Sequence, residues 1–207
     1  MIEQGTPEWF EQRRGKVTGS MITAVLAEKS QSEATTRRNY RYQLALERIT
    51  GVVLPNNLNT VEMQAGKDNE YIARGTYEGE NGVMVEEVSF VDHPTIEWLG
   101  ISPDGRVPGG LVEIKCPKPA IHMDYMLTEE IPYEYRAQMT LQMLCTGEKW
   151  CDFVSFCPLM PDALKYMCLR YYPQPALVSE ITIKTIKFLA EVKALVTDME
   201  NMIKDRT

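Results

Sequence analysis

Hydrophobic residues recur every three or four positions in several segments, which is the spacing of an amphipathic helix. The clearest series lies near the C-terminal end, where it begins with Ile183, Ile186 and Leu189. Two of the segments are followed by a glycine, Gly51 or Gly147, and glycine commonly ends a helix. These signals predict helices over residues 20–26, 32–50, 60–77, 132–145 and 179–204.

Other segments alternate apolar and polar residues or carry short apolar runs, as strands do. Turns are expected at His93-Pro94 and at Pro103-Asp104-Gly105. The predicted strands span residues 83–91, 96–101, 111–116, 150–156 and 164–171. Helices followed by strands in this order indicate an α/β fold, a central mixed β-sheet flanked by helices. Because we find no internal repeat and no linker-like stretch, we expect a single domain over residues 1–207.

Composition narrows the function classes. Hydrophobic residues make up 44% of the chain and charged residues 25%, which excludes a largely disordered protein. No stretch approaches the roughly 20 apolar residues of a membrane helix, and residues 1–10 lack a signal-peptide layout. Five cysteines without a CxxC pair and two histidines disfavour a zinc knuckle or a histidine-based triad. We therefore expect a cytoplasmic protein with reduced thiols, whose chemistry rests on carboxylates, lysine or arginine.

The net charge of −7 argues against a simple binder of polyanions. The charge is uneven, however: residues 1–50 hold 8 basic and 6 acidic residues (+2), and the remainder holds 14 basic and 23 acidic ones (−9). One interpretation is that the acidic part includes metal-binding carboxylates and that the basic quarter contacts phosphates. The alternative is a pair of solvated helix faces.

The segment around Asp104 carries the clearest chemistry. Strand side chains alternate, so Glu113 and Lys115 share one face of the predicted strand. Asp104, in the turn before that strand, can fold back beside Glu113, and two converging carboxylates suit a hard cation such as Mg²⁺. Lys115 could then hold or deprotonate a water, and we expect burial to lower its pKa. The alternative is a surface Glu-Lys pair on an edge strand after an ordinary turn.

Further residues extend the candidate site. Glu70, in a predicted helix, could supply a third carboxylate. Arg13 lies shortly before Thr18 and Ser20 at a predicted helix start, where exposed N–H groups, hydroxyls and a guanidinium form an anion site. Gln138, on the helix after the charged strand, could hydrogen-bond a water or a phosphate. Taken alone, each of these residues is better explained by a plain structural role such as a helix cap or a solvated helix face.

Together these fragments resemble the PD-(D/E)xK nuclease superfamily and, within it, the lambda exonuclease or YqaJ-like viral recombinase family. The resemblance runs from about Trp9 to Tyr172. It rests on the order and spacing of six motifs: Trp9-x-x-x-Arg13, Thr18-Gly19-Ser20, Gly66-Lys67-x-x-Glu70, Ser102-Pro103-Asp104-Gly105, Glu113-Ile114-Lys115-Cys116-Pro117 and Ala137-Gln138.

The resemblance implies a restriction-endonuclease-like core and a processive 5′→3′ exonuclease. Such an enzyme degrades one strand of linear duplex DNA from a 5′-phosphorylated end and leaves a 3′ overhang for recombination by single-strand annealing. It implies two Mg²⁺ ions, with Mn²⁺ as a substitute, and a homotrimeric ring around the DNA. It also implies a single-strand annealing partner of the Bet or RecT kind, no membrane, and the cytoplasm of a bacterial host, with the gene carried by a phage or prophage.

The family pattern also assigns roles to residues. Asp104 would bridge both ions, Glu113 and the main-chain carbonyl of Ile114 would complete one, and Glu70 the other. Lys115 and Gln138 would position the attacking water. The 5′-phosphate would be bound by Arg13 (rather than its neighbour Arg14), Thr18 and Ser20. The point at which the strands separate would be lined by Trp9, Leu58 and Met63.

Three other functions stay open at this point. A site-specific or structure-specific endonuclease could use the same core, although the chain has little spare length for base-reading loops. An iron–sulfur helicase-nuclease relative would need an early cysteine ligand, which the sequence lacks. A non-catalytic module that binds DNA ends would have no need for Asp104, Glu113 and Lys115 together.

Overall fold

The computed structural model describes residues 2–29, 32–54 and 61–206, without the side chains of residues 61–68. Its α-helices are α1 (Pro7–Arg13), α2 (Ile22–Leu26), α3 (Thr35–Thr50), α4 (Val61–Asn81), α5 (Pro119–Thr128), α6 (Tyr133–Thr146) and α7 (Pro175–Lys204), with short 3₁₀ turns η1 (Gly19–Met21) and η2 (Asp162–Leu164). Its strands are β1 (Val17–Thr18), β2 (Val91–Asp92), β3 (Leu99–Ile101), β4 (Gly105–Val107), β5 (Gly110–Lys115), β6 (Cys151–Phe156) and β7 (Tyr166–Tyr171).

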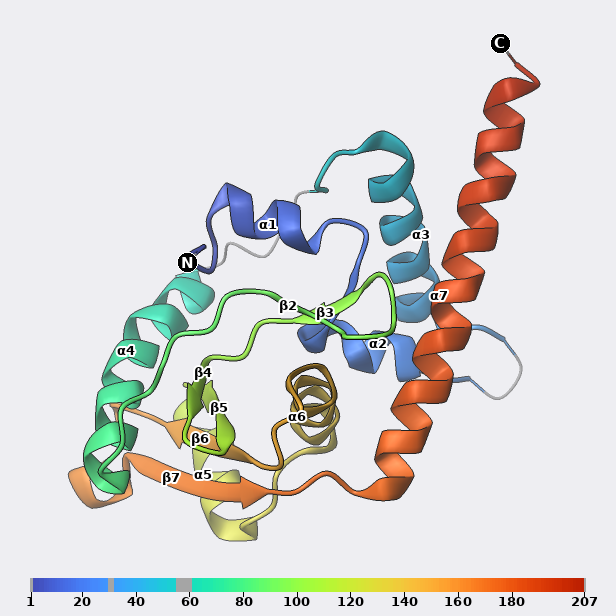
Figure 1. The fold of residues 1–207 in the computed structure, drawn as a ribbon. Helices are drawn as coiled ribbons and strands as arrows, with labels where there is room; N and C mark the ends of the chain where they lie inside the picture. The colour runs from blue at the N-terminus through green and yellow to red at the C-terminus, as the bar shows by residue number, and fades with distance from the viewer. Residues whose placement is uncertain (1, 30–31, 55–60, 207) are drawn as a thin grey trace.

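The larger sheet has the strand order β4-β5-β6-β7 (Figure 1). The pairs β4–β5 and β6–β7 are antiparallel, whereas β5 and β6 are parallel and are connected through α5 and α6. Side chains alternate along β5, so that Val112 and Ile114 pack toward α4 while Leu111 packs toward α6. The sheet therefore lies between two helices, and the charged residues Glu113 and Lys115 share the α6 face.

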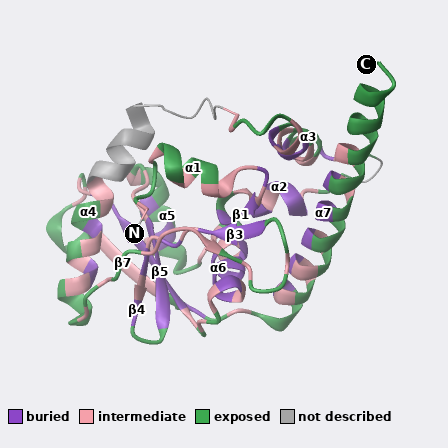
Figure 2. Cartoon of the chain, turned by 45° about the horizontal axis from the view of Figure 1, so that its top comes forward, coloured by how far each residue is buried: buried purple, intermediate pink, exposed green. Residues whose placement is uncertain are grey.

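A second, smaller sheet has the order β1-β3-β2 and lies beside the largest apolar cluster. This cluster joins α2, α3, α6 and α7, and the ring of Phe188 on α7 stacks on Tyr40 of α3 with centroids 5.7 Å apart. Figure 2 shows the buried residues on the strands and on the inner sides of the helices, while the outer side of α7 is exposed. The C-terminal part of α7 extends beyond the rest of the molecule (Figure 1).

Two glycines are required by their surroundings. Gly110 begins β5 directly against the indole of Trp150, where a Cβ atom would come within 2.4 Å of ring atoms. Gly147 ends α6 in the left-handed conformation at φ 76°, and its N–H donates to the carbonyl of Met143. The first glycine fixes the start of the charged strand, and the second ends the helix that faces it.

The expected α/β class with a mixed sheet flanked by helices is confirmed. The strand expected over 83–91 is wrong for most of its length: residues 83–90 pair only through a bridge between Glu86 and Arg106, because the neighbouring strand β4 has just three residues. The strands expected over 96–101 and 164–171 begin late, at Leu99 and Tyr166. The helices expected over 60–77 and 179–204 instead span Val61–Asn81 and Pro175–Lys204.

Two helices, α1 and α5, were not predicted. The helix α1 has seven residues, too few to show a period, and it is capped by the Thr6 side chain. In α5 the apolar residues Ile121, Met123 and Leu127 are exposed, while His122 and Tyr125 are buried. Apolar residues on the outer side hide the helical stripe in the sequence. Within the described part of the chain, no helix combines the length and the hydropathy needed to cross a bilayer.

Packing between α3 and α7 gives a first prediction. Phe188 is fully buried, stacks on Tyr40 and lies 5.0 Å below the Arg37 guanidinium. We expect Phe188→Ala to lower the free energy of unfolding by about 3–5 kcal/mol, because it leaves a cavity that rigid neighbours cannot fill. Urea unfolding measures the loss. The control is Ile183→Ala on the same helix, where 67% exposure predicts a change within about 0.5 kcal/mol; equal losses would contradict the packing.

Candidate active site

The β4–β5 hairpin brings Asp104 back to the charged strand. Gly105 pairs with Val112 in the antiparallel register, so Asp104 comes next to Glu113. The Oδ2 atom of Asp104 accepts a 2.7 Å hydrogen bond from the backbone N–H of Ile114. Since the N–H and C=O of one residue in an extended strand point to the same edge, the Ile114 carbonyl also faces the Asp104 side.

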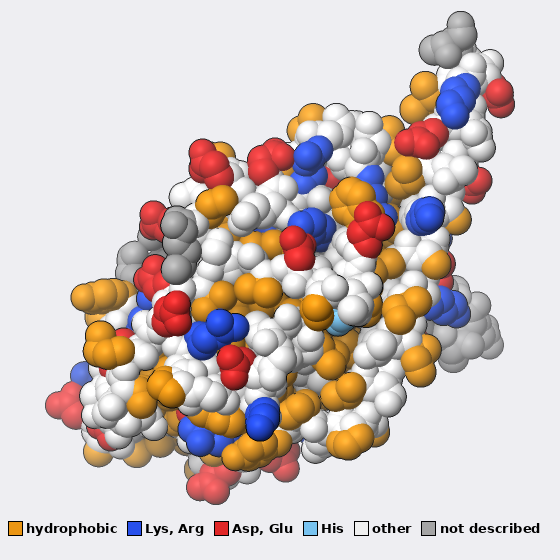
Figure 3. Space-filling model, in the orientation of Figure 1, with side chains coloured by type: hydrophobic (Ala, Val, Ile, Leu, Met, Phe, Trp, Pro, Cys, Tyr) orange, Lys and Arg blue, Asp and Glu red, His pale blue; other side chains and the backbone are white. Residues whose placement is uncertain are grey.

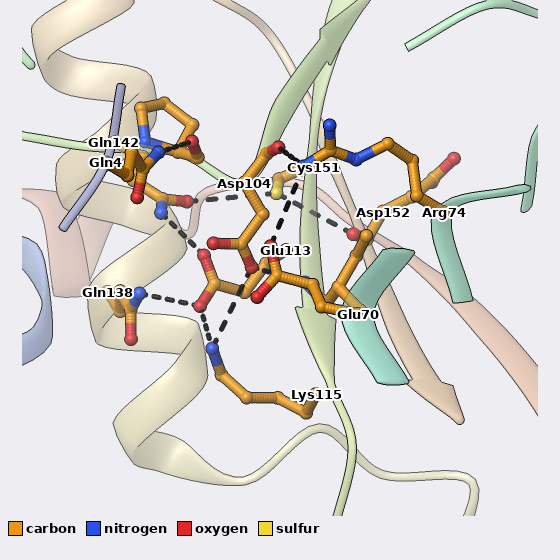
Figure 4. A network of polar contacts seen from close by, with 12 residues as sticks. Gln4, Glu70, Arg74, Asp104, Glu113, Lys115, Gln138, Gln142, Cys151 and Asp152 are labelled. Carbon is orange, nitrogen blue, oxygen red and sulfur yellow. Dashed lines mark hydrogen bonds and ion pairs between the residues drawn. The ribbon is translucent and has the colours of Figure 1, made fainter. Parts of the chain in front are cut away.

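Glu113 lies on the sheet face toward α6 and has no solvent exposure. Its Oε1 atom accepts a hydrogen bond of 2.6 Å from Gln138 Nε2, and its Oε2 atom accepts one of 2.6 Å from Gln142 Nε2. Lys115 also donates to Oε1 (Figure 4). A buried carboxylate needs such donors, because burial without them is costly. The Glu113 carboxylate is therefore held from two elements, its own strand and α6.

Lys115 lies between the two acidic side chains. Its ammonium contacts Glu113, lies 4.0 Å from Asp104 Oδ2 and sits 5.4 Å from the centre of the Tyr135 ring. Burial opposes its charged form, but the carboxylates of Glu113 and Asp104 outweigh burial and raise the pKa of Lys115. The expectation of a lowered pKa is thus wrong for this arrangement, because burial acts here together with two opposite charges.

Asp104 has a strongly perturbed carboxyl group. Burial raises the pKa of Asp104 well above its usual range, and the negative charges of Glu113 and Glu70 raise it further, while Lys115 partly opposes them. The ionised form of Asp104 is therefore held against neighbouring like charges. A positive charge placed among these groups would relieve that repulsion.

Glu70 approaches the same turn from α4. Figure 4 places its carboxylate beside Asp104. Arg74, one helical turn further on, lies 3.7 Å from Glu70 Oε1 and donates a 3.3 Å hydrogen bond to the main-chain carbonyl of Asp104. One guanidinium therefore connects the helix that carries Glu70 to the turn that carries Asp104.

The donor chemistry fits a hard divalent cation. Among the described residues, no three His, Cys, Asp or Glu side chains form a ready-made metal cage. Mg²⁺ does not require one, since it keeps several waters and binds through one or two carboxylates. Asp104, Glu113 and the Ile114 carbonyl offer such oxygens, and a cation would balance the negative charges of Glu113 and Glu70, which add to burial in raising the pKa of Asp104.

The N-terminal arm packs on the same turn. The indole N–H of Trp9 donates to Ser102 Oγ at 2.9 Å, and Arg13 Nη1 donates to the same oxygen at 3.3 Å. The Arg13 guanidinium lies 4.0 Å from the centre of the Trp9 ring, and burial lowers the pKa of Arg13 to about 10. Gln4 donates a 2.9 Å hydrogen bond to the carbonyl of Pro103. Arg13 is thus fixed two residues from the acidic turn.

The neighbouring arginine lies in a different setting. Arg14 pairs with Glu11 at 3.0 Å, and both side chains are at least one-third exposed. Arg14 therefore has an acidic partner at the surface, whereas Arg13 contacts the turn that precedes Asp104. The assignment of the 5′-phosphate contact to Arg13 rather than Arg14 stays a prediction.

The predicted anion site at residues 18–20 lies against α6. Thr18 is buried and its side chain makes no capping hydrogen bond, whereas Ser20 is exposed in η1. Between them, Gly19 is close to Gln138: a Cβ atom on Gly19 would lie 3.5 Å from Gln138 Cγ. The fold therefore places Gly19, the residue before Ser20, beside the α6 residue that bonds Glu113. The helix that follows, α2, has only five residues, so its dipole contributes little.

The three strand-separation candidates are placed unequally. Leu58 lies outside the described residues, and Met63 lies in α4 where side chains are not described. Trp9 is half-buried, with its N–H bonded to Ser102 and one face of its ring covered by Arg13. Base stacking by these residues stays a prediction.

Sequence reasoning missed three residues that shape the site: Ser102, Arg74 and Gln142. Gln142 follows Gln138 by four positions, which places both amides on one helix face. That spacing was a usable signal, because Gln138 was already a candidate site residue on this helix. Ser102 belongs to the Ser102-Pro103-Asp104-Gly105 motif, but its role as an acceptor arises from contacts with α1. Nothing local in the sequence marks Arg74, because its role arises from its contact with the acidic turn.

The fold and the candidate active site together define a class of nucleases. A mixed sheet flanked by helices, with an aspartate before a Glu-x-Lys strand, is the core of the PD-(D/E)xK nucleases. Within that class the chain belongs to the YqaJ-like viral recombinase family, whose domain matches residues 8–149. No curated protein matches the chain.

Solved structures agree with this assignment. An alkaline exonuclease from Laribacter hongkongensis (LHK-Exo) is 40% identical, with a TM-score of 0.88 over 98% of this chain and 100% of that one. The same enzyme in complex with dAMP gives 40% identity and a TM-score of 0.89 over the same shares of both chains. A phage-related exonuclease from Haemophilus somnus is 14% identical, with a TM-score of 0.72 over 89% of this chain and 96% of that one, and it shares the fold.

Proposed function

We propose that the protein is a Mg²⁺-dependent, processive exonuclease that degrades one strand of linear duplex DNA 5′→3′ from a 5′-phosphorylated end. The resulting 3′ overhangs serve recombination by single-strand annealing. The observation that carries the proposal is the convergence of Asp104, Glu113 and Lys115, with Glu70 beside them. Support comes from the 40% identical alkaline exonuclease, which binds dAMP, the kind of mononucleotide that an exonuclease releases.

The residues divide the chemistry among them. Asp104, Glu113 and the Ile114 carbonyl would hold one divalent ion, and Asp104 with Glu70 a second, with Mn²⁺ able to replace Mg²⁺. Two such ions would lower the pKa of bound water and would stabilise charge on the phosphoryl oxygens. Lys115 donates hydrogen bonds to the attacking water, and Gln138 orients that water while it also binds Glu113.

The proposal extends to the assembly and its partner. We propose a homotrimeric ring that encloses the duplex and works with an annealing protein of the Bet or RecT type. Figure 3 shows Lys and Arg interspersed with Asp and Glu on the face it presents. A closed ring does not need a strongly basic exterior to stay on DNA, which reconciles processivity with the net charge of −7.

The phosphate contact gives a second prediction. We expect Arg13→Gln to reduce the preference for 5′-phosphorylated over 5′-hydroxyl duplex by about 10-fold or more, because a charge-assisted hydrogen bond contributes about 1.5–3 kcal/mol. Competitive digestion of the two substrates measures the preference. Arg14→Gln is the matched control, since Arg14 pairs with Glu11. A preference that survives Arg13→Gln and falls with Arg14→Gln would reverse the assignment.

Digestion of linear duplex labelled at either 5′ end or at either 3′ end, with and without Mg²⁺, tests the function. The proposal requires release of labelled mononucleotide from 5′ ends, dependence on the metal, and surviving 3′ single strands. Covalently closed circular duplex should remain intact. Cutting of the circle would instead favour an endonuclease, and binding to ends without any release of nucleotide would favour a non-catalytic module.

A further inference from the structure

Gln142 is a fully buried residue on α6 that directly contacts the acidic cluster. Its Nε2 atom donates a 2.6 Å hydrogen bond to Oε2 of Glu113. The other carboxylate oxygen, Oε1, accepts from Gln138 and from Lys115. Different side chains therefore hold the two carboxylate oxygens of Glu113. Gln142 holds Oε2, the oxygen that Lys115 does not contact.

The amide of Gln142 has one orientation. A carboxylate only accepts hydrogen bonds, so the Gln142 nitrogen must face Glu113 and its oxygen must face the opposite way. On that opposite side, the Cys151 sulfur lies 4.0 Å from Gln142 Oε1 and 3.9 Å from the Asp152 carbonyl oxygen, so its one S–H faces two acceptors. Burial raises the pKa of Cys151 well above its usual value, so the thiol keeps its proton. The β6 strand thus supports the amide that supports Glu113.

The two glutamines have different surroundings. Gln138 is partly exposed and lies beside Gly19, while Gln142 is enclosed in the core. Lys115 is one-quarter exposed and carries a positive charge on a flexible side chain. Gln142 is the neutral partner that stays fixed, and it orients Glu113 without cancelling its charge. A metal-binding carboxylate depends on such hydrogen bonds from surrounding residues.

We propose that Gln142 is a positioning residue that holds Glu113 in the orientation for divalent-cation binding and thereby sets the affinity of the cluster for the ion. The inference rests on the proposed function, because it takes Glu113 as a ligand. Gln142 does not touch DNA or the reacting atoms. Its loss therefore acts through the ion, and a higher ion concentration should restore activity.

The test compares Gln142→Met with Thr140→Val. Methionine has a similar volume and no donor. Thr140 is equally buried on the same helix, but its hydroxyl bonds Tyr171 and the Arg136 carbonyl rather than Glu113. Binding of Mn²⁺ alone, followed by electron paramagnetic resonance without DNA, is expected to weaken about 10–100-fold in Gln142→Met and to stay unchanged in Thr140→Val. The Mg²⁺ concentration for half-maximal cleavage should rise in parallel, with kcat recovered at saturating Mg²⁺.

The outcomes separate the inference from the function. Unchanged Mn²⁺ binding in a folded Gln142→Met protein, or a kcat that no Mg²⁺ concentration restores, would overturn the positioning role alone. Absence of Mn²⁺ binding by the unaltered protein would overturn the proposed metal site together with the inference. If Gln142→Met does not fold, Gln142→Asn replaces it. The asparagine keeps an amide, but its shorter side chain withdraws that amide from Glu113 Oε2. The expected weakening of Mn²⁺ binding is the same.

Discussion

Replacement of Lys115 by alanine is expected to lower the cleavage rate by about 10²–10⁴-fold while DNA binding stays nearly unchanged. The magnitude is that of a positioned proton-transfer or water-orienting group. Lys115 contacts Glu113 and lies 4.0 Å from Asp104, so its ammonium is placed where an attacking water would meet both acids. Single-turnover digestion gives the rate, and fluorescence anisotropy with Ca²⁺, a hard cation that takes the same oxygen ligands, gives the binding.

The control for this substitution is Lys149→Ala. Lys149 is exposed and lies just before the start of β6. Lys115 pairs with Ser155 near the end of β6, because β5 and β6 run parallel. The two lysines are therefore at opposite ends of the sheet. Its replacement should leave the rate unchanged. Rapid cleavage by Lys115→Ala would remove the role of Lys115, and loss of DNA binding in that variant would show a binding role instead.

Asp104→Asn is expected to abolish cleavage and, in chelating buffer, to raise the thermal stability of the protein. Cleavage fails because the amide oxygen is a much weaker ligand for a hard cation than the carboxylate. Stability rises because burial and the charges of Glu113 and Glu70 raise the pKa of Asp104, so its ionised form is unfavourable in the fold. Asparagine keeps an oxygen that can accept the Ile114 hydrogen bond.

The pH dependence of stability follows from the same shift. The folded protein holds the Asp104 proton more tightly than the unfolded chain does, so stability from this group is complete below the usual pKa of 3.8 and is lost as pH rises through the raised pKa. The Tm of Asp104→Asn should therefore exceed that of the unaltered protein at neutral pH with EDTA, and the gap should narrow on acidification. Mg²⁺ should stabilise only the unaltered protein. A lower Tm for Asp104→Asn in EDTA would contradict this electrostatic account.

The acidic hairpin was predictable because its determinants are local. Alternation along the strand puts Glu113 and Lys115 on one face, and the Pro-Asp-Gly turn returns Asp104 to the strand. The predicted strand over 111–116 and helix over 132–145 agree with β5 and α6 to within one residue at each end. Glu70 was a candidate third carboxylate from its sequence context, but only the family pattern implied that it shares a metal with Asp104, because their separation along the chain hides their proximity.

The other features of the site and the fold could not be predicted, because they depend on contacts between residues far apart in the sequence. Ser102 receives hydrogen bonds from Trp9 and Arg13, about 90 residues away, and no period in the chain signals that pairing. The raised pKa of Lys115 depends on a balance between burial and two carboxylates, which only the assembled site determines. Pairing at residue 86 ends after one bridge because β4 is short, a property of the partner strand rather than of the segment itself.

The central claim is that Asp104 and Glu113, with Glu70 nearby, bind divalent cations in place of their contacts with Lys115. The most direct measurement is the anomalous scattering of Mn²⁺ in crystals of the protein. We predict a manganese peak within coordination distance of Asp104 and Glu113, accompanied by withdrawal of the Lys115 ammonium from the pair. A fully soaked crystal with no manganese at these carboxylates, and with Lys115 still bound to Glu113, would contradict the account.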